Sequence, residues 1–334
     1  MPATASNAIV VDGLNCAPVT REQIQRTLAG GVNAINLTSV NPWDDFSASM
    51  SDLSRTLKVI AGSKDIAMIA RTVGDIQTAK KENKLAFVLG TQGSTLVEKD
   101  LELLRMMQLA GFRIMQPTYM ERNDLGSGVL GKPGDDGLTP LGHKWVALMN
   151  ELNMLIDLSH VGYKTAADVL KASKQPVIFS HANARALCDS LRNIPDELMT
   201  AAAKTGGTVG ATLWPPMLRH DQRPTIEDWA DQIVYMINLV GADHVAFGSD
   251  LSEGRYRDDD HWQQSFGPKG MYPEVTAVLG PWFKFETRIT EGYESMANTT
   301  RLPEALQRRQ IKSDAIDKVM GGNLLRVYRE VWGE

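Results

Sequence analysis

Two short apolar segments that each end in Ser-His constrain the fold of this chain more than any other feature. They are Met154–Leu158 and Pro176–Phe179, and a helical pattern lies between them. Apolar runs of this length predict strands that are buried on both faces, and two such strands joined by one helix form a right-handed parallel unit. We therefore expect His160 and His181 at the C-terminal ends of neighbouring strands, where α/β folds bind their ligands.

The same alternation of strand and helix patterns continues along the chain. Apolar runs that predict strands start near residues 9, 32, 85, 112, 154, 176, 207 and 244, with Ile66–Ala70 as an additional segment. Eight strand–helix units in 334 residues predict a (β/α)8 barrel, or TIM barrel. A doubly wound open sheet is the alternative, but no Gly-x-Gly-x-x-Gly follows the first strand. We expect one domain over residues 1–334, with long loops at 119–138 and 251–285 and helices at its C-terminus.

Composition excludes several classes of partner. The net charge of −5 and the pI near 5.8 argue against nucleic acid and against an anionic membrane surface. No run of 18 apolar residues is present, and the first residues show no signal-peptide pattern. Cys16 and Cys188 are the only cysteines, so a disulfide framework is not implied. We expect a cytoplasmic protein whose partner is a small molecule.

Polar residues that follow the predicted strands indicate a metal or substrate site. In a closed barrel the C-terminal strand ends meet at one mouth, which brings His160, His181 and Asp250 together. Two neutral imidazoles and a carboxylate suit zinc, which would acidify a bound water. Asp250 can serve as a third ligand or as the base that takes the proton from that water. Arg192 follows the His181 strand and is a candidate clamp for a substrate carboxylate, although a surface salt bridge is the alternative.

The chain resembles the renal (membrane) dipeptidase family, zinc dipeptidases of the amidohydrolase superfamily, in segments along nearly its whole length. These are GLTPLGHKWVALMNELNM, IDLSHVG, PVIFSHANARAL, RNIPDEL, HVAFGSD and GGNLLRVYREVWG. The resemblance implies a (β/α)8 barrel that hydrolyses dipeptides, usually with two zinc ions sharing a carboxylate. It also implies that His160 and His181 bind the second zinc, that Asp250 lies beside the bridging water, and that Arg192 holds the substrate's carboxylate. Tyr119 stands where many members carry a substrate-contacting His.

The ligands of the first zinc are altered in this chain. The family's first strand normally ends in Asp-Gly-His-x-Asp, whereas this chain has Leu14 and Cys16 at the two ligand positions. Gln92 stands where the bridging Glu is expected, and a Gln lacks the negative charge that bridges two cations. Three possible states of the metal site remain. One zinc could stay on His160, His181 and Asp250 with Cys16 or Gln92 as a weak extra ligand, Cys16 could be a thiolate ligand, or the site could be metal-free.

These observations favour a dipeptidase-like amidohydrolase that cleaves a small peptide, amide or related C–N bond with an activated water and with one metal ion or none. Two alternatives stay open. One is a metal-free lyase or isomerase that moves protons through the two histidines and Asp250. The other is a non-catalytic protein that binds a small carboxylate. Trp262, Trp282 and Phe283 lie in the 251–285 segment and could belong to a lid over the site or to a homodimer contact.

Overall fold

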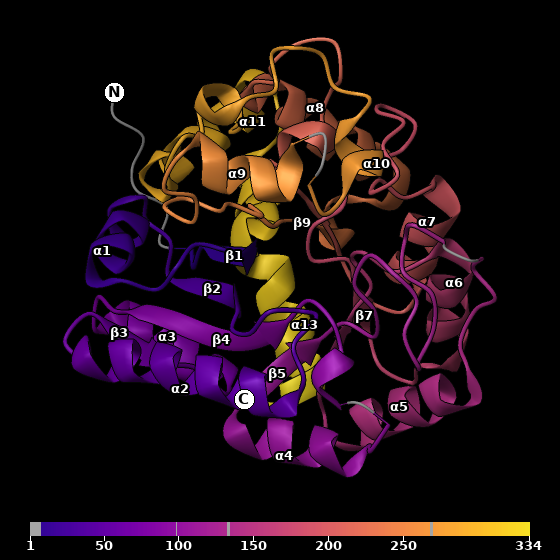
Figure 1. The fold of residues 1–334 in the computed structure, drawn as a ribbon. Coiled ribbons are helices and arrows are strands. Elements are labelled where there is room, and N and C mark those ends of the chain that lie inside the picture. Colours follow the sequence, from indigo (N-terminus) through magenta and orange to yellow (C-terminus); the bar gives the residue numbers. More distant parts are fainter. Residues whose placement is uncertain (1–7, 98, 132–133, 268–269) are drawn as a thin grey trace.

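Parallel strands form the centre of the computed structural model, which describes residues 8–97, 99–131, 134–267 and 270–334. Seven of the nine strands in these residues form one sheet in the order β1-β2-β4-β5-β6-β7, with β3 beside β4, and the remaining two form the pair β8-β9 (Figure 1). The strands are β1 (Val11–Asn15), β2 (Ala34–Thr38), β3 (Ala67–Ile69), β4 (Leu85–Thr91), β5 (Phe112–Met115), β6 (Leu155–Asp157), β7 (Val177–Ile178), β8 (Val209–Ala211) and β9 (Val245–Phe247).

Single parallel bridges join the two sheets at both of their edges. Phe179 pairs with Val209 beyond β7, and Asn15 pairs with Leu251 beyond β9, so eight strands close into a ring. The strand β3 stays outside this ring because it pairs only with the first half of β4, whose second half pairs with β5. The predicted (β/α)8 barrel is therefore confirmed, and Ile66–Ala70 is the additional strand segment.

Helices surround the strands, and several of them begin at capping residues that the sequence offers. Thr20, Thr72 and Thr139 each accept a hydrogen bond from the backbone N–H three residues later. No helix in the described ranges is long and apolar enough to span a bilayer. The α-helices are α1 (Arg21–Ala29), α2 (Phe46–Gly62), α3 (Val73–Lys81), α4 (Glu102–Ala110), α5 (Pro140–Glu151), α6 (Tyr163–Ala172), α7 (Asp196–Lys204), α8 (Ile226–Val240), α9 (Asp259–Phe266), α10 (Pro273–Thr276), α11 (Arg301–Arg308), α12 (Ser313–Asp317) and α13 (Asn323–Trp332).

The interior of the barrel is filled by one set of small and branched side chains and is closed by α13. Most of the ring strands contribute to this cluster, for example through Val11, Ile114 and Ile178, and the apolar face of α13 adds Leu324 and Tyr328. The segment before α13 meets the start of β1, where a Cβ on Gly321 would lie 2.2 Å from the backbone oxygen of Ile9, so the C-terminal segment covers the N-terminal end of the barrel. The C-terminal ends are left for the site.

Hydrogen bonds connect the first strand, β1, to the residues that follow the last strand, β9. The buried Asp12 carboxylate accepts hydrogen bonds from the backbone N–H of Ser249 at 2.7 Å and from its hydroxyl at 2.6 Å. The backbone N–H of Asp250 donates to the carbonyl oxygen of Leu14 at 3.0 Å. The position of Asp250 is therefore tied directly to β1.

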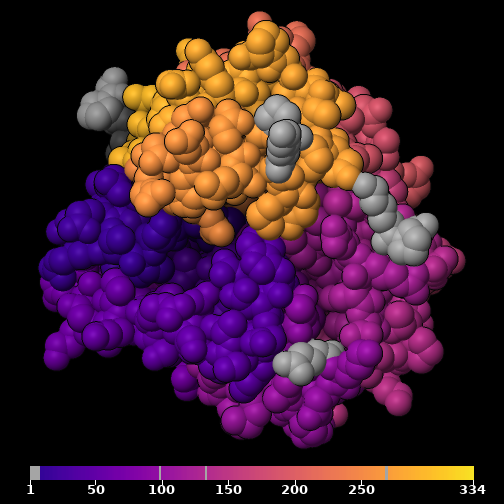
Figure 2. Space-filling model, viewed as in Figure 1, coloured from indigo at the N-terminus to yellow at the C-terminus, as the bar shows by residue number. Residues whose placement is uncertain are grey.

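The 251–285 segment was expected to be a long loop, and that expectation is wrong in part. Its described residues include α9, which Asp258 caps, and α10, which begins at Pro273. Helices of eight and four residues are too short to show a clear apolar period. Short 3-10 turns follow at Phe285–Thr287 and Met296–Thr300. In Figure 2 the orange segment that contains α9 and α10 borders a hollow beside the indigo N-terminal part.

Candidate active site

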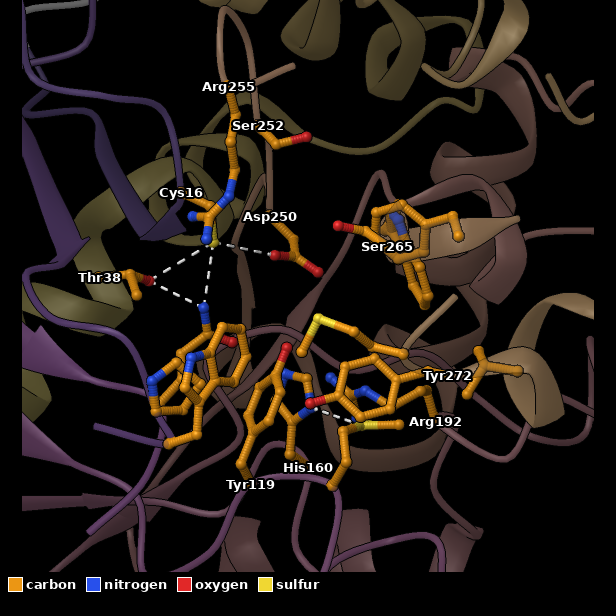
Figure 3. Close-up of a pocket in the computed structure, with 18 of the residues that line it drawn as sticks. Cys16, Thr38, Tyr119, His160, Arg192, Asp250, Ser252, Arg255, Ser265 and Tyr272 are labelled. Carbon is orange, nitrogen blue, oxygen red and sulfur yellow. Dashed lines mark hydrogen bonds between the residues drawn. The ribbon is translucent and has the colours of Figure 1, made fainter. Parts of the chain in front are cut away.

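One cavity lies at the C-terminal ends of the strands and collects most of the residues singled out from the sequence. Its volume is about 100 Å³, several times the space that one water molecule needs. The lining includes Cys16, Gln92, Tyr119, His160, Arg192 and Asp250 from the barrel side, with Arg255, Tyr256, Phe266 and Tyr272 from the 251–285 segment (Figure 3). His181 does not line the cavity but lies fully buried beside His160.

Two strand-end residues of the site have a backbone conformation that side chains with a Cβ rarely adopt. The φ angle is +69° at His160 and +50° at Asp250. Such left-handed residues cost free energy and gather at functional sites, where surrounding contacts hold them. Each residue lies three positions after the end of its strand, and both line the cavity at the barrel mouth.

A chain of hydrogen bonds fixes the protonation of the two histidines. The Ser180 hydroxyl donates to Asp157 at 2.5 Å, so it must accept from His181 Nδ1, which lies 2.7 Å away. His181 Nε2 is then unprotonated and accepts from His160 Nε2 at 2.9 Å. Burial, followed by the nearby positive charge of Arg192, holds the pKa of both imidazoles well below the usual range. Both rings are therefore neutral donors and acceptors near pH 7.

The positions of the altered zinc ligands are joined by hydrogen bonds among uncharged groups. Gln92 Nε2 donates to Cys16 Sγ at 3.1 Å and to Thr38 Oγ1 at 2.9 Å. The Cys16 thiol in turn donates to Asp250 Oδ1 at 3.4 Å. Burial and the negative charge of Asp250 raise the pKa of Cys16 to about 12, so the thiol stays protonated. Burial raises the pKa of Asp250 to about 6 against the opposing charge of Arg192.

Arg192 is a buried cation without a hydrogen-bonded partner in the described part of the chain. Its side chain is 2% exposed, and its Nη2 atom has no acceptor. Burial lowers its pKa, while the nearby Asp250 carboxylate opposes that shift. A desolvated guanidinium with free donors is suited to receive a carboxylate from a ligand. The Tyr119 ring packs on His160 at a centroid distance of 4.2 Å, and burial raises its pKa well above the usual range, so its hydroxyl remains a donor.

The donor atoms do not fit a metal centre in the arrangement that they have. No three His, Cys, Asp or Glu side chains of the described residues come together as ligands. Two imidazoles that bind one zinc must each present an unprotonated nitrogen atom to the ion. Here His160 Nε2 and His181 Nε2 are 2.9 Å apart and share a proton in a hydrogen bond, and the Arg192 charge acts on both. We therefore derive no catalytic step through a metal, and ligation by the two histidines stays a prediction.

Several residues of the cavity were missed from the sequence, among them Thr38 and Arg255. Thr38 ends the second strand, so the rule that strand ends meet at one mouth could have found it. Arg255 lies five residues after Asp250 in a segment without periodicity, and only its closeness to a predicted strand end could have pointed to it.

Comparisons with known proteins agree with the fold and the sequence motifs. The family model described as membrane dipeptidase (peptidase family M19) matches residues 11–279. The chain is 27% identical over 290 residues to dipeptidase tcpJ of Claviceps purpurea, a match that covers 85% of this chain and 61% of that relative. The chain therefore spans less than two thirds of this relative's length.

Two solved structures have the same architecture over nearly the whole chain. An amidohydrolase from Pseudomonas aeruginosa has a TM-score of 0.89 and 32% identity, and the match covers 98% of this chain and 97% of that one. A metallo peptidase from Rhodobacter sphaeroides, liganded with a phosphinate mimic of the dipeptide L-Ala-D-Ala, has a TM-score of 0.79 and 19% identity, with 98% and 100% covered. The second likeness shows the barrel fold alone.

Proposed function

This chain belongs to the membrane dipeptidase family (peptidase family M19), and from that premise we propose that it is an amidohydrolase of small, carboxylate-bearing, peptide-like substrates. The observation that carries the proposal is the placement of Asp250 and Arg192 in one cavity, a carboxyl group with a pKa of about 6 beside a buried guanidinium whose Nη2 lacks a partner. The first group can move protons near neutral pH, and the second can anchor a substrate.

The residues of the cavity can divide the hydrolysis between them. Arg192 binds the carboxylate of the substrate and positions its amide bond. Asp250, mostly ionised at pH 7, takes a proton from a water molecule whose oxygen attacks the carbonyl carbon. The Tyr119 hydroxyl donates a hydrogen bond to the carbonyl oxygen as that atom gains negative charge. When the C–N bond breaks, Asp250 returns its proton to the departing nitrogen, so the products are a carboxylic acid and an amine.

The test is a kinetic assay with a panel of dipeptides and N-acyl amino acids, using protein purified without chelators. We expect turnover by the wild type, a loss of about 10²- to 10⁴-fold in kcat in Asp250→Asn, and mainly a higher KM in Arg192→Met. Asp65→Asn is the matched control, because Asp65 is an exposed carboxylate that pairs with Arg21 on the surface. Unchanged turnover in Asp250→Asn would contradict the proposal, and tight binding without turnover of any compound would favour a binding protein.

The metal content of the same protein decides between a metal-free site and a single-metal site. Stoichiometric zinc that is lost in His160→Ala would show that the imidazole pair opens to hold an ion. Substoichiometric metal, together with activity that survives chelation, would support hydrolysis by the side chains alone.

A second candidate is a metal-free lyase or isomerase, and the two neutral histidines with fixed proton positions favour it. Such an enzyme would exchange a carbon-bound hydrogen of its substrate with deuterium from D2O without releasing an amine. Amine release without that exchange would exclude this candidate for the compound tested.

A further inference from the structure

Arg255 reaches the cavity from the segment that follows β9. The backbone N–H of Arg255 donates to the carbonyl oxygen of Ser252 at 3.0 Å, and Gly254 has a φ of +75°, so the chain turns sharply here. Figure 3 shows the side chain running from this turn toward Cys16. The charge of Arg255 opposes the rise in pKa that burial causes at both Cys16 and Asp250, as expected for a nearby cation.

The Arg255 guanidinium forms no hydrogen bond or ion pair with another described residue, although acidic side chains are close to it in sequence. Glu253 is already paired with Arg26 at 3.2 Å and accepts from the backbone N–H of Met296. Asp258 caps α9 and faces Arg257 at 3.8 Å. These two acidic residues are therefore engaged elsewhere, and Arg255 stays available to a ligand.

The charged groups that line the cavity do not balance. Arg192 and Arg255 are both cations, and Asp250 is the single carboxylate among the described lining residues. In Figure 3 the two guanidinium groups lie on different sides of the Asp250 carboxylate. A substrate amide placed over Asp250 would therefore have one guanidinium toward its acyl side and the other toward its amine side.

An ordinary zwitterionic dipeptide does not suit these charges. Its ammonium group would have to approach one of the two guanidiniums or bind Asp250, which the proposed hydrolysis needs as a base. Like charges at close range are repulsive, and a cation bound to Asp250 would keep that carboxylate from taking a proton from water.

Resting on the proposed function, we propose that the preferred substrate is a small amide with one carboxylate on each side of the scissile bond and no free ammonium group. Arg192 binds one carboxylate and Arg255 the other, as charge-assisted hydrogen bonds to guanidinium groups allow. An N-carboxyacyl amino acid has this chemistry.

The test compares N-succinyl-alanine with N-butanoyl-alanine, in the L and D forms, by kcat/KM. The two compounds differ in the acyl-side carboxylate, and the wild type should favour the succinyl compound by roughly 10- to 100-fold. In Arg255→Gln this ratio should fall toward one. Arg257→Gln should keep the wild-type ratio, because the Arg257 side chain is 80% exposed and points to Asp258 in the same segment. Equal rates for the two compounds in the wild type, or a ratio that Arg255→Gln leaves intact, would overturn the inference.

Binding measurements separate this inference from the proposed function. If neither compound is cleaved, but calorimetry shows that N-succinyl-alanine binds more tightly than N-butanoyl-alanine and that Arg255→Gln removes the difference, the hydrolase proposal fails and the inference stands. If both compounds are cleaved equally well, the hydrolase proposal stands and the inference fails.

Discussion

Replacing Arg192 by Met should make the protein more stable and should weaken its binding of a carboxylate ligand. The guanidinium is buried, its Nη2 atom lacks an acceptor, and burial lowers its pKa, all of which indicate a charge that the unliganded fold does not compensate. An unsatisfied buried polar group costs about 1–3 kcal/mol. A Met side chain of similar length keeps the packing without that cost.

The size of the gain depends on pH through Asp250. Near pH 5 this carboxyl group, with a pKa of about 6, is mostly protonated, so removing Arg192 takes no partner from it and the free energy of unfolding should rise by about 1–3 kcal/mol. Without Arg192 the pKa of Asp250 rises further above its unfolded value. The native state then loses stability as pH climbs through that pKa, so the gain should shrink near pH 8.

Urea unfolding followed by tryptophan fluorescence measures the free energy of unfolding at about pH 5 and about pH 8. Arg257→Met is the exposed control. An Arg192→Met protein less stable than the wild type at both pH values would refute this reasoning, because it would show that the guanidinium has partners that stabilise the fold. Carboxylate binding should weaken at either pH.

Three other perturbations have definite signs. Because we propose that Asp250 acts as an anion, kcat/KM should rise with pH through about 6. Cys16→Ala removes a hydrogen bond to that carboxylate and should move the midpoint of the pH–rate profile upward by up to about one unit. A downward move would contradict this role. Ser180→Ala leaves Asp157 and the His181 imidazole without the hydroxyl that both contact. Urea unfolding should therefore show a loss of about 1–3 kcal/mol in the free energy of unfolding, and an unchanged midpoint would contradict the assigned chain of hydrogen bonds. Gly248→Ala would place a Cβ 2.1 Å from the backbone oxygen of Ser180, so its Tm and activity should both fall, whereas Gly62→Ala, which meets open space, should change neither.

Sequence patterns predicted the barrel because most of its strands are apolar runs with clear turn signals on both sides. The pairing of His160 with His181 followed from the same logic, since matched positions in one parallel unit must be neighbours. The position of β3 outside the ring agrees with the sequence count, which set Ile66–Ala70 apart as an additional segment, and its pairing with the first half of β4 is the structural reason.

The details of the site depend on contacts that no local pattern encodes. The hydrogen bond between Cys16 and Gln92 joins residues 76 positions apart, and the resemblance implied only that both stand at ligand positions of the family. The approach of Arg255 depends on a tight turn at Gly254 inside a segment without periodicity. The protonation of the two imidazoles depends on Ser180, whose role as a bridge to Asp157 appears only when neighbouring strands are in register.

The hydrogen bonds that connect β1 to the end of β9 through Asp12 and Ser249 link the recovery of activity to the closure of the barrel during folding. These residues are 237 positions apart, so their contact closes nearly the whole length of the barrel and belongs to the long-range contacts that are slow to form. A chain that has built every other strand but has not joined these two would already contain Arg192 and the histidine pair, yet Asp250, which we propose as the general base, would not be in position. During refolding, the recovery of turnover should therefore lag behind the recovery of the helical circular dichroism signal. The delay would measure how long the ring of strands takes to close.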